Sequence, residues 1–157
     1  MTVVAVEAWV EAPLRRFVED ARTVLALLLH PSGQVVAQSG FARAIDVMSA
    51  CALAAAIHAS AGELGRQLEG RPFRGLHHAG RDRQLYLAEA PTARGPFLVL
   101  TVFDQESSLG LVRMYFDEFS RNLAAAAPPP PRNAEPVLAQ QFEQDLNKNL
   151  ATLFRRG

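Results

Sequence analysis

The chain has few of the groups that would form cross-links, span a membrane or direct export. Cys51 is its single cysteine in 157 residues, which excludes an internal disulfide framework and fits a reducing compartment. It has no run of about 20 uninterrupted apolar residues, so no membrane span is predicted. The opening stretch MTVVAVEAWVEAPLRRF lacks the basic start, apolar run and cleavage site of a signal peptide. These absences predict a cytoplasmic protein.

An excess of either charge is also missing. Lysine plus arginine and aspartate plus glutamate are 16 each, so the formal net charge is zero. Nucleic-acid-binding domains usually carry a basic excess, and the composition therefore argues against that class. Hydrophobic residues are 49% and charged residues 20%, a typical globular mixture whose length suits one domain with a tail.

Motifs for catalysis and metal binding are scarce. The chain has no GxxxxGK[ST], HExxH, paired CxxC or GxSxG pattern. His77 and His78 are neighbours in a predicted strand, so they point to opposite faces and cannot easily share a metal ion. Cys51 and His58 lie two helical turns apart, about 10 Å, which is too far for direct proton transfer. We predict no catalytic residue, no cofactor and no metal, with Cys51 a small buried hydrophobe.

Three polar residues near the last predicted helix could have either a structural or a chemical role. Asp104 and Glu106 lie where a strand runs into that helix, a position that favours capping over acid–base chemistry. Arg113 could form a surface ion pair or reach a phosphate group, and both interpretations stay open.

Hydrophobic periodicity predicts an α+β domain in the order helix, two strands, helix, three strands, helix. The predicted helices are 8–20, 46–68 and 109–125, and the predicted strands are 23–29, 34–39, 75–79, 84–90 and 96–103. Five mostly antiparallel strands with helices form a layered domain. The strand 75–79 is a short open edge, which makes pairing with a second copy an option.

The C-terminal part has a different composition. We divide the chain into a domain at 1–127, a proline-rich linker at 128–136 and an amphipathic helix at 137–157. The prolines make the linker a semi-rigid spacer. The apolar residues of the tail recur at helical spacing: Leu138, Phe142, Leu146, Leu150, Leu153 and Phe154. So short a helix is marginal alone in water, so this stripe needs its own domain, a second copy or a partner.

The long central helix has two apolar faces. A stripe with leucines is expected to cover the sheet: Ala50, Leu53, Ile57, Ala61, Leu64 and Leu68. The opposite face is mostly apolar and small: Met48, Ala52, Ala55, Ala59, Gly62 and Arg66, with Ala56 beside them. Alanine favours helix, and scattered surface alanines need no explanation. The contiguous run nevertheless favours an interface, because small side chains let another backbone approach closely.

Three stretches carry a family resemblance. They are the hairpin LLLHPSGQVV, the helix opening at Ile45-Asp46, and the segment VFDQESSLGLVR at 102–113. Together they resemble the Roadblock superfamily of dynein light chain-like proteins, and more closely its bacterial MglB type. The resemblance covers about 8–125 and extends in layout to the tail. It implies a five-stranded sheet with helices on both faces, plus the C-terminal helix.

The resemblance also implies a function. Such proteins are homodimers whose sheets join edge to edge and whose long helices form a platform for one Ras-like GTPase of the MglA type. They stimulate its GTP hydrolysis without an arginine finger and set cell polarity or motility. Carried over, the GTPase-binding platform falls on Ala52, Ala55, Ala56 and Ala59. A second contact, from the tail, falls on Phe142, Leu146, Leu150, Leu153 and Phe154.

This chain departs from the family pattern in two places. Ala54-Ala55-Ala56-Ile57 stands where members often have Thr-Ala-Gly-Asn, and the tail ends in Phe154-Arg155-Arg156-Gly157 where familiar tails are acidic. Two alternatives remain beside the activator. One is a non-catalytic dimeric scaffold for a small GTPase or polarity protein. The other is a small-ligand sensor with a closed apolar pocket.

Overall fold

The computed structural model describes residues 3–130 and 144–149, and its elements follow the predicted order with one strand added at the start. The helices are η1 (Ala8–Val10, a 3-10 turn), α1 (Glu11–Asp20), α2 (Val47–Glu69) and α3 (Leu109–Ala126). The strands are β1 (Val3–Ala5), β2 (Leu25–Leu29), β3 (Val35–Gly40), β4 (Gly75–Ala79), β5 (Gln84–Thr92) and β6 (Gly95–Phe103). Residues 144–149 are helical, within the predicted tail helix.

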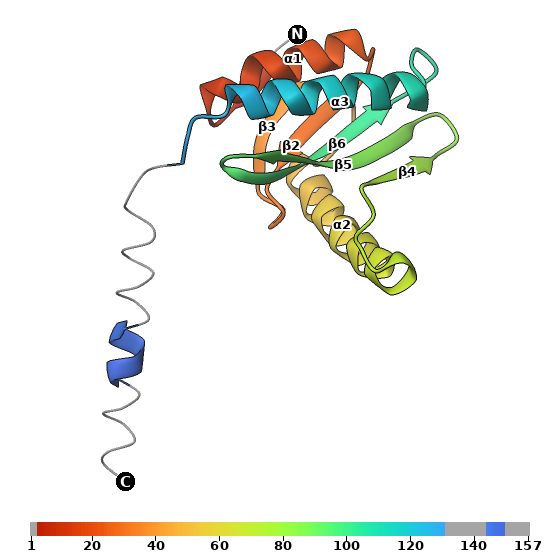
Figure 1. Ribbon diagram of the computed structural model, residues 1–157. Coiled ribbons are helices and arrows are strands. Elements are labelled where there is room, and N and C mark those ends of the chain that lie inside the picture. The colour runs from red at the N-terminus through yellow and green to blue at the C-terminus, as the bar shows by residue number, and fades with distance from the viewer. Residues whose placement is uncertain (1–2, 131–143, 150–157) are drawn as a thin grey trace.

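The strands form one antiparallel sheet in the order β1-β3-β2-β6-β5-β4, with helices on both faces (Figure 1). This arrangement confirms the predicted α+β class. Strand β4 lies at an edge, as expected. Strand β1 is additional and pairs with β3 from Val3↔Ser39 to Ala5↔Ala37. Three residues are too few to show a strand period, which is why the sequence did not reveal β1.

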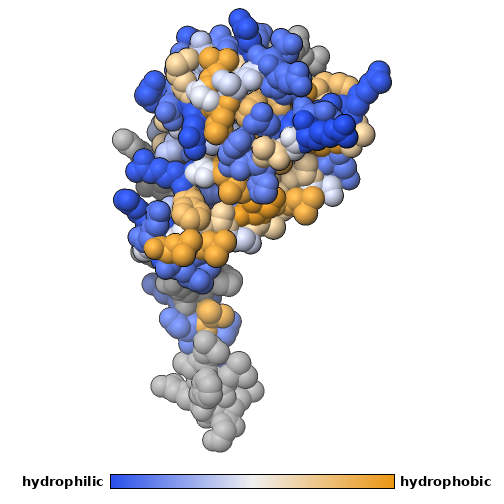
Figure 2. Space-filling model, turned by 90° about the vertical axis from the view of Figure 1, so that its right-hand side faces the viewer, coloured by the Kyte–Doolittle hydropathy of each residue, from blue (hydrophilic) through white to orange (hydrophobic). Residues whose placement is uncertain are grey.

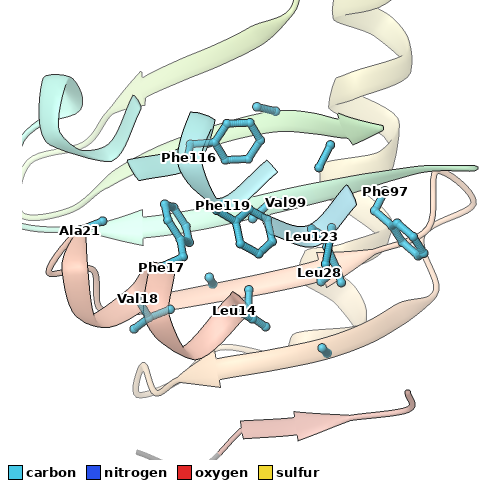
Figure 3. Close-up of a cluster of buried hydrophobic side chains, with 14 of the residues drawn as sticks. Leu14, Phe17, Val18, Ala21, Leu28, Phe97, Val99, Phe116, Phe119 and Leu123 are labelled. Carbon is cyan, nitrogen blue, oxygen red and sulfur yellow. The ribbon is translucent and has the colours of Figure 1, made fainter. Parts of the chain in front are cut away.

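Helices α1 and α3 pack together over one face of the sheet. Their aromatic side chains point toward the strands and one another, and they surround Leu28 and Val99 (Figure 3). The rings of Phe17 and Phe119 lie 5.2 Å apart, and Phe17 meets Phe116 edge-on. Such aromatic pairs add to the burial of large apolar area. This layer is the main core of the domain.

Strand β2 shows how the sheet separates two cores. All five of its side chains are fully buried. Ala26 and Leu28 pack with α1 and α3, whereas Leu25, Leu27 and Leu29 pack on the side of α2. Alternation of side chains across the pleat explains this division. The continuously apolar run was therefore correctly interpreted as a strand buried on both faces.

Side-chain caps define the two long helices. The Asp46 carboxylate accepts a hydrogen bond from the Ser49 amide at 3.3 Å and begins α2. Gly70 ends it in the left-handed conformation, with φ of 76°. Ser108 accepts from the Leu111 amide at 3.2 Å and begins α3. These contacts satisfy amide groups that a helix start leaves unpaired.

Candidate functional site on helix α2

Helix α2 lies by itself on the second face of the sheet and touches it through a narrow strip of small residues (Figure 1). The buried residues of α2 are Cys51, Ala54, Ala55, Gly62 and Gly65. The turn of the β2–β3 hairpin also approaches closely. A Cβ built at Gly33, whose φ is +96°, would lie 3.3 Å from the Cα of Ala52. The helix is thus seated close to the strands.

The predicted orientation of α2 is wrong in one respect. The stripe with leucines was expected to cover the sheet, but Leu53 is 63% exposed, Leu64 54% and Leu68 73%. A helix that is apolar on most of its surface can be seated on any face. Here the small side chains of Cys51, Ala54 and Ala55 let the backbone come nearer the strands than leucines would. The large apolar side chains are left on one flank of the helix.

The alanines predicted as a platform lie in two environments, the solvent-exposed surface of α2 and its contact with the sheet. Ala52, Ala56 and Ala59 are exposed. Ala55 is 9% exposed and packs with the strands. At roughly 100° per residue, the exposed alanines fall on a separate flank from the leucines. Helix α2 therefore presents two distinct surfaces, which we name the leucine flank (Leu53, Ile57, Leu64, Leu68) and the alanine flank (Ala52, Ala56, Ala59).

Apolar side chains gather in the lower half of the domain, at the level of α2 (Figure 2). Met48 at the start of the helix is 77% exposed, and Ile57 in its middle is 39% exposed. Apolar side chains gathered in this way on a protein surface commonly mark an interaction site. Helix α2 is accordingly the candidate functional site.

Within the described ranges, α2 is also the one helix long and apolar enough, by length and composition, to cross a bilayer. A single helix of this kind is weak evidence for a span, because helices packed inside globular proteins pass the same test. Here one strip of the helix lies against the sheet. The remaining apolar surface belongs to the candidate interaction site.

Titratable groups on α2 are engaged structurally. His58 Nε2 lies 3.2 Å from Glu89 Oε2, so its partner is a carboxylate of β5 and not Cys51. Burial raises the pKa of the Cys51 thiol and keeps it protonated at neutral pH. The interpretation of Cys51 as a buried hydrophobe agrees with this burial.

The remaining candidates for chemistry also have structural partners. The His77 ring contacts the Gln84 amide oxygen at 2.7 Å and stacks on Phe103, whereas His78 is exposed. The Arg113 guanidinium lies 5.9 Å from the ring centre of Tyr86. Among the residues whose placement is known, no group of three or more histidine, cysteine or acidic side chains could hold a metal ion.

The junction before α3 uses its polar residues for backbone contacts. The Asp104 carboxylate accepts from the Glu106 amide at 3.0 Å, which stabilises the turn ahead of the helix. Ser107 donates its hydroxyl hydrogen to the Ala21 carbonyl and thereby joins the end of α1 to the start of α3. Capping of α3 itself falls to Ser108. The predicted structural role of this segment is correct, and the cap agrees with the sequence, in which Ser107 or Ser108 could begin this helix.

The predicted tail contact lies mostly outside the described residues. Leu146 is described, helical and 48% exposed. Phe142, Leu150, Leu153 and Phe154 lie outside those residues, so their role stays a prediction.

One signal in the sequence could have revealed the seating of α2. Glycines at 62 and 65 are poor helix formers, and their presence within a long helix usually has a packing reason. Both are buried on the same side of the helix as Cys51 and Ala54, and a Cβ at Gly65 would meet the backbone of residues 71–73.

Comparison with known proteins identifies the architecture. No family model and no curated protein matches the sequence. Solved structures do match. MglB of Myxococcus xanthus superposes with a TM-score of 0.67 at 26% identity, covering 75% of this chain and 94% of that one. The gliding protein MglB of Thermus thermophilus superposes with a TM-score of 0.67 at 26% identity, covering 80% of this chain and 96% of that one. A Roadblock/LC7 domain of Streptomyces avermitilis superposes with a TM-score of 0.61 at 16% identity, covering 71% of this chain and 91% of that one.

The chain therefore has a Roadblock-superfamily fold. Within that superfamily, the fold is of the MglB type. This fold class consists of regulatory, non-enzymatic domains.

Proposed function

We propose that this protein is a dimeric regulator that binds a Ras-like GTPase of the MglA type and stimulates its GTP hydrolysis, in bacterial polarity or motility. The observation that carries the proposal is the exposed apolar surface of α2 on a fold of the MglB type. A helix of this length with its large side chains outward needs a partner to cover them.

The leucine flank is the proposed contact between two copies. Leu53, Leu64 and Leu68 are each more than half exposed and follow one another along the helix. Two such helices side by side would remove these side chains from water. Complete burial of one leucine stabilises by about 1.5–3 kcal/mol. The open edge of β4 supports the same arrangement, since two such edges can join in one continuous sheet.

The alanine flank is the proposed GTPase contact. Ala52, Ala56 and Ala59 are exposed and small, so a partner backbone can approach the helix closely. Ala55 supports this surface from beneath, because it packs on the strands. The tail residues Phe142, Leu146, Leu150, Leu153 and Phe154 would add a second contact on the GTPase.

The proposed activation needs no catalytic residue from this chain. A Ras-like GTPase carries its own catalytic groups, and an activator that inserts an arginine accelerates hydrolysis about 10⁵-fold in other systems. On this side of α2 the nearest arginine, Arg66, is already paired with Glu63 at 3.3 Å. The expected mechanism is therefore repositioning of the GTPase's own groups, with a smaller acceleration. We place the protein in the cytoplasm, where its GTPase would be.

The test is single-turnover GTP hydrolysis by a co-encoded MglA-type GTPase, with and without this protein at saturating concentration. We expect faster hydrolysis and tighter binding of the GTP-loaded form in a parallel pull-down. Binding without acceleration would assign the protein to the scaffold class. Absence of binding to both the GTP- and GDP-loaded forms would overturn the proposal.

A further inference from the structure

A second surface lies away from the α2 flanks, beside helix α3. A groove of about 800 Å³ runs between α3, the loop before β4 and the edge of β5. Strand β4 pairs with β5 only as far as Ala88, so Glu89–Thr92 has no strand beyond it on that side in the described sheet. The groove occupies this gap, and its volume falls within the usual range for a ligand site.

Aromatic side chains form the floor of the groove. Tyr86 and Phe116 meet edge-on with ring centres 5.6 Å apart. Each residue keeps a small solvent-exposed fraction, 8% for Tyr86 and 5% for Phe116, and both line the groove. Phe73 borders the floor from the loop before β4. Such a floor can hold one or two apolar side chains of a bound segment.

The rim of the groove is basic. Arg74, Arg113 and Arg121 border it and are exposed. Within the described residues, none of the three makes an ion pair. Two acidic residues also border the groove, Asp117 and Glu89, and the Glu89 carboxylate lies 3.2 Å from His58. Three arginines against two carboxylates leave the rim with an excess of one positive charge, in a chain whose formal net charge is zero.

From this geometry we propose that the groove binds an extended acidic segment of a partner protein, with an aromatic or aliphatic residue between its carboxylates. Arg113 and Arg121 are eight residues apart on α3, about 12 Å along the helix. An extended peptide rises about 3.3 Å per residue, so carboxylates about four residues apart match the two arginines. Arginine binds carboxylates strongly because its planar fork donates two parallel hydrogen bonds.

This site is independent of the proposed GTPase contact. The groove is bordered by α3, β5 and the loop before β4, and includes none of the exposed residues of α2. A partner held there would leave both flanks of α2 open. The protein would then join two partners at once.

The probe is a short fluorescein-labelled peptide, GDEFLDEG, followed by anisotropy on the full chain without any GTPase. The groove variant is Arg113→Glu with Arg121→Glu, and the matched control is Arg81→Glu with Arg83→Glu, which are exposed and do not border the groove. We expect binding by the wild type and the control. The groove variant should lose at least about tenfold in affinity. The neutral peptide GNQFLNQG should bind weakly to all three.

A second groove variant and a folding control distinguish loss of binding from loss of structure. Arg74→Glu with Arg121→Glu serves as a second groove variant, since it leaves the contact between Arg113 and Tyr86 in place. Circular dichroism confirms that each variant is folded. No binding by the wild type, or equal losses in groove and control variants, overturns the proposal. So does tighter binding of a labelled oligouridylate, which would make the groove a nucleic-acid site.

Discussion

The backbone of Phe73 passes so close to Gly65 that a Cβ at residue 65 would stand 2.5 Å from the Phe73 amide nitrogen. The same atom would lie 2.7 Å from the Arg71 carbonyl oxygen. Glycine is therefore required in this turn of α2, because the chain that leaves the helix at Gly70 folds back over it. This close approach fixes where β4 begins relative to the helix.

Gly65→Ala should destabilise the domain by about 1–3 kcal/mol, since the added methyl meets backbone that cannot easily move. Gly110→Ala is the matched control, because a Cβ at Gly110 in α3 would meet no atom within 4 Å. The control should stabilise by about 0.5–1 kcal/mol. Urea unfolding followed by circular dichroism measures both. Equal effects would mean that the contact with Phe73 is not tight in solution.

The Cys51 thiol should make stability fall at alkaline pH. Burial raises its pKa in the folded state above the ordinary value of 9.0, so the folded protein holds this proton more tightly than the unfolded chain. The stabilisation is complete below pH 9 and decreases as the pH rises above it. Cys51→Ala removes the titratable group and should flatten this part of the profile. Urea midpoints measured from pH 7 to 10 compare the two, and parallel profiles would contradict the prediction.

Leu64→Glu should weaken association between copies. The variant places a charge where an apolar side chain, 54% exposed in the single chain, is proposed to be buried. The loss of about 1.5–3 kcal/mol corresponds to roughly tenfold to a hundredfold in the dissociation constant. Met114→Glu on α3 is the control, since Met114 is 55% exposed and lies outside the proposed contact. Sedimentation equilibrium measures both, and a dimer unaffected by Leu64→Glu would place its interface elsewhere.

Ala59→Arg should abolish GTPase binding while the protein stays folded. A long charged side chain on the alanine flank prevents close approach and would bury a charge without a partner. Ala124→Arg introduces the same side chain at an exposed position of α3. Biolayer interferometry with the GTP-loaded GTPase compares them. Normal binding by a folded Ala59→Arg protein would show that the alanine flank is not the contact.

Truncation after Ala134 should leave the domain folded and weaken GTPase activation. Among the described residues, the two core clusters extend along the chain as far as Leu123 in α3. Thermal unfolding and single-turnover hydrolysis separate the two effects. A lower melting temperature with unchanged activation per folded dimer would instead make the tail a structural element.

Much of the fold could be predicted from the sequence because most elements have one unambiguous period. Val112, Phe116, Phe119 and Leu123 recur at helical spacing, and all four are buried in α3. The strand at 25–29 is continuously apolar and is buried on both faces. Strand β1 was missed because its three residues show no period, and its pairing depends on β3.

The orientation of α2 could not be obtained in the same way. Leucine and isoleucine occupy one flank, alanine another, and small residues a third, so periodicity alone favoured the largest side chains for the core. The structure instead buries Cys51 and Ala54. Close backbone approach, and not side-chain size, decides which face meets the sheet. That is a tertiary property, which hydrophobic periodicity does not show.

The small-residue strip has a consequence for motion. Alanine and cysteine bury little area, so each contact of α2 with the sheet contributes less than the aromatic contacts of α1 and α3. The free energy of local opening should therefore be lower for α2, and its amides should exchange sooner than those of α3. Helix α2, the proposed binding surface, is thus held less firmly by its own domain than α1 and α3 are. Binding of a partner to α2 should therefore reduce the local fluctuations of this helix more than it changes the conformation of the domain.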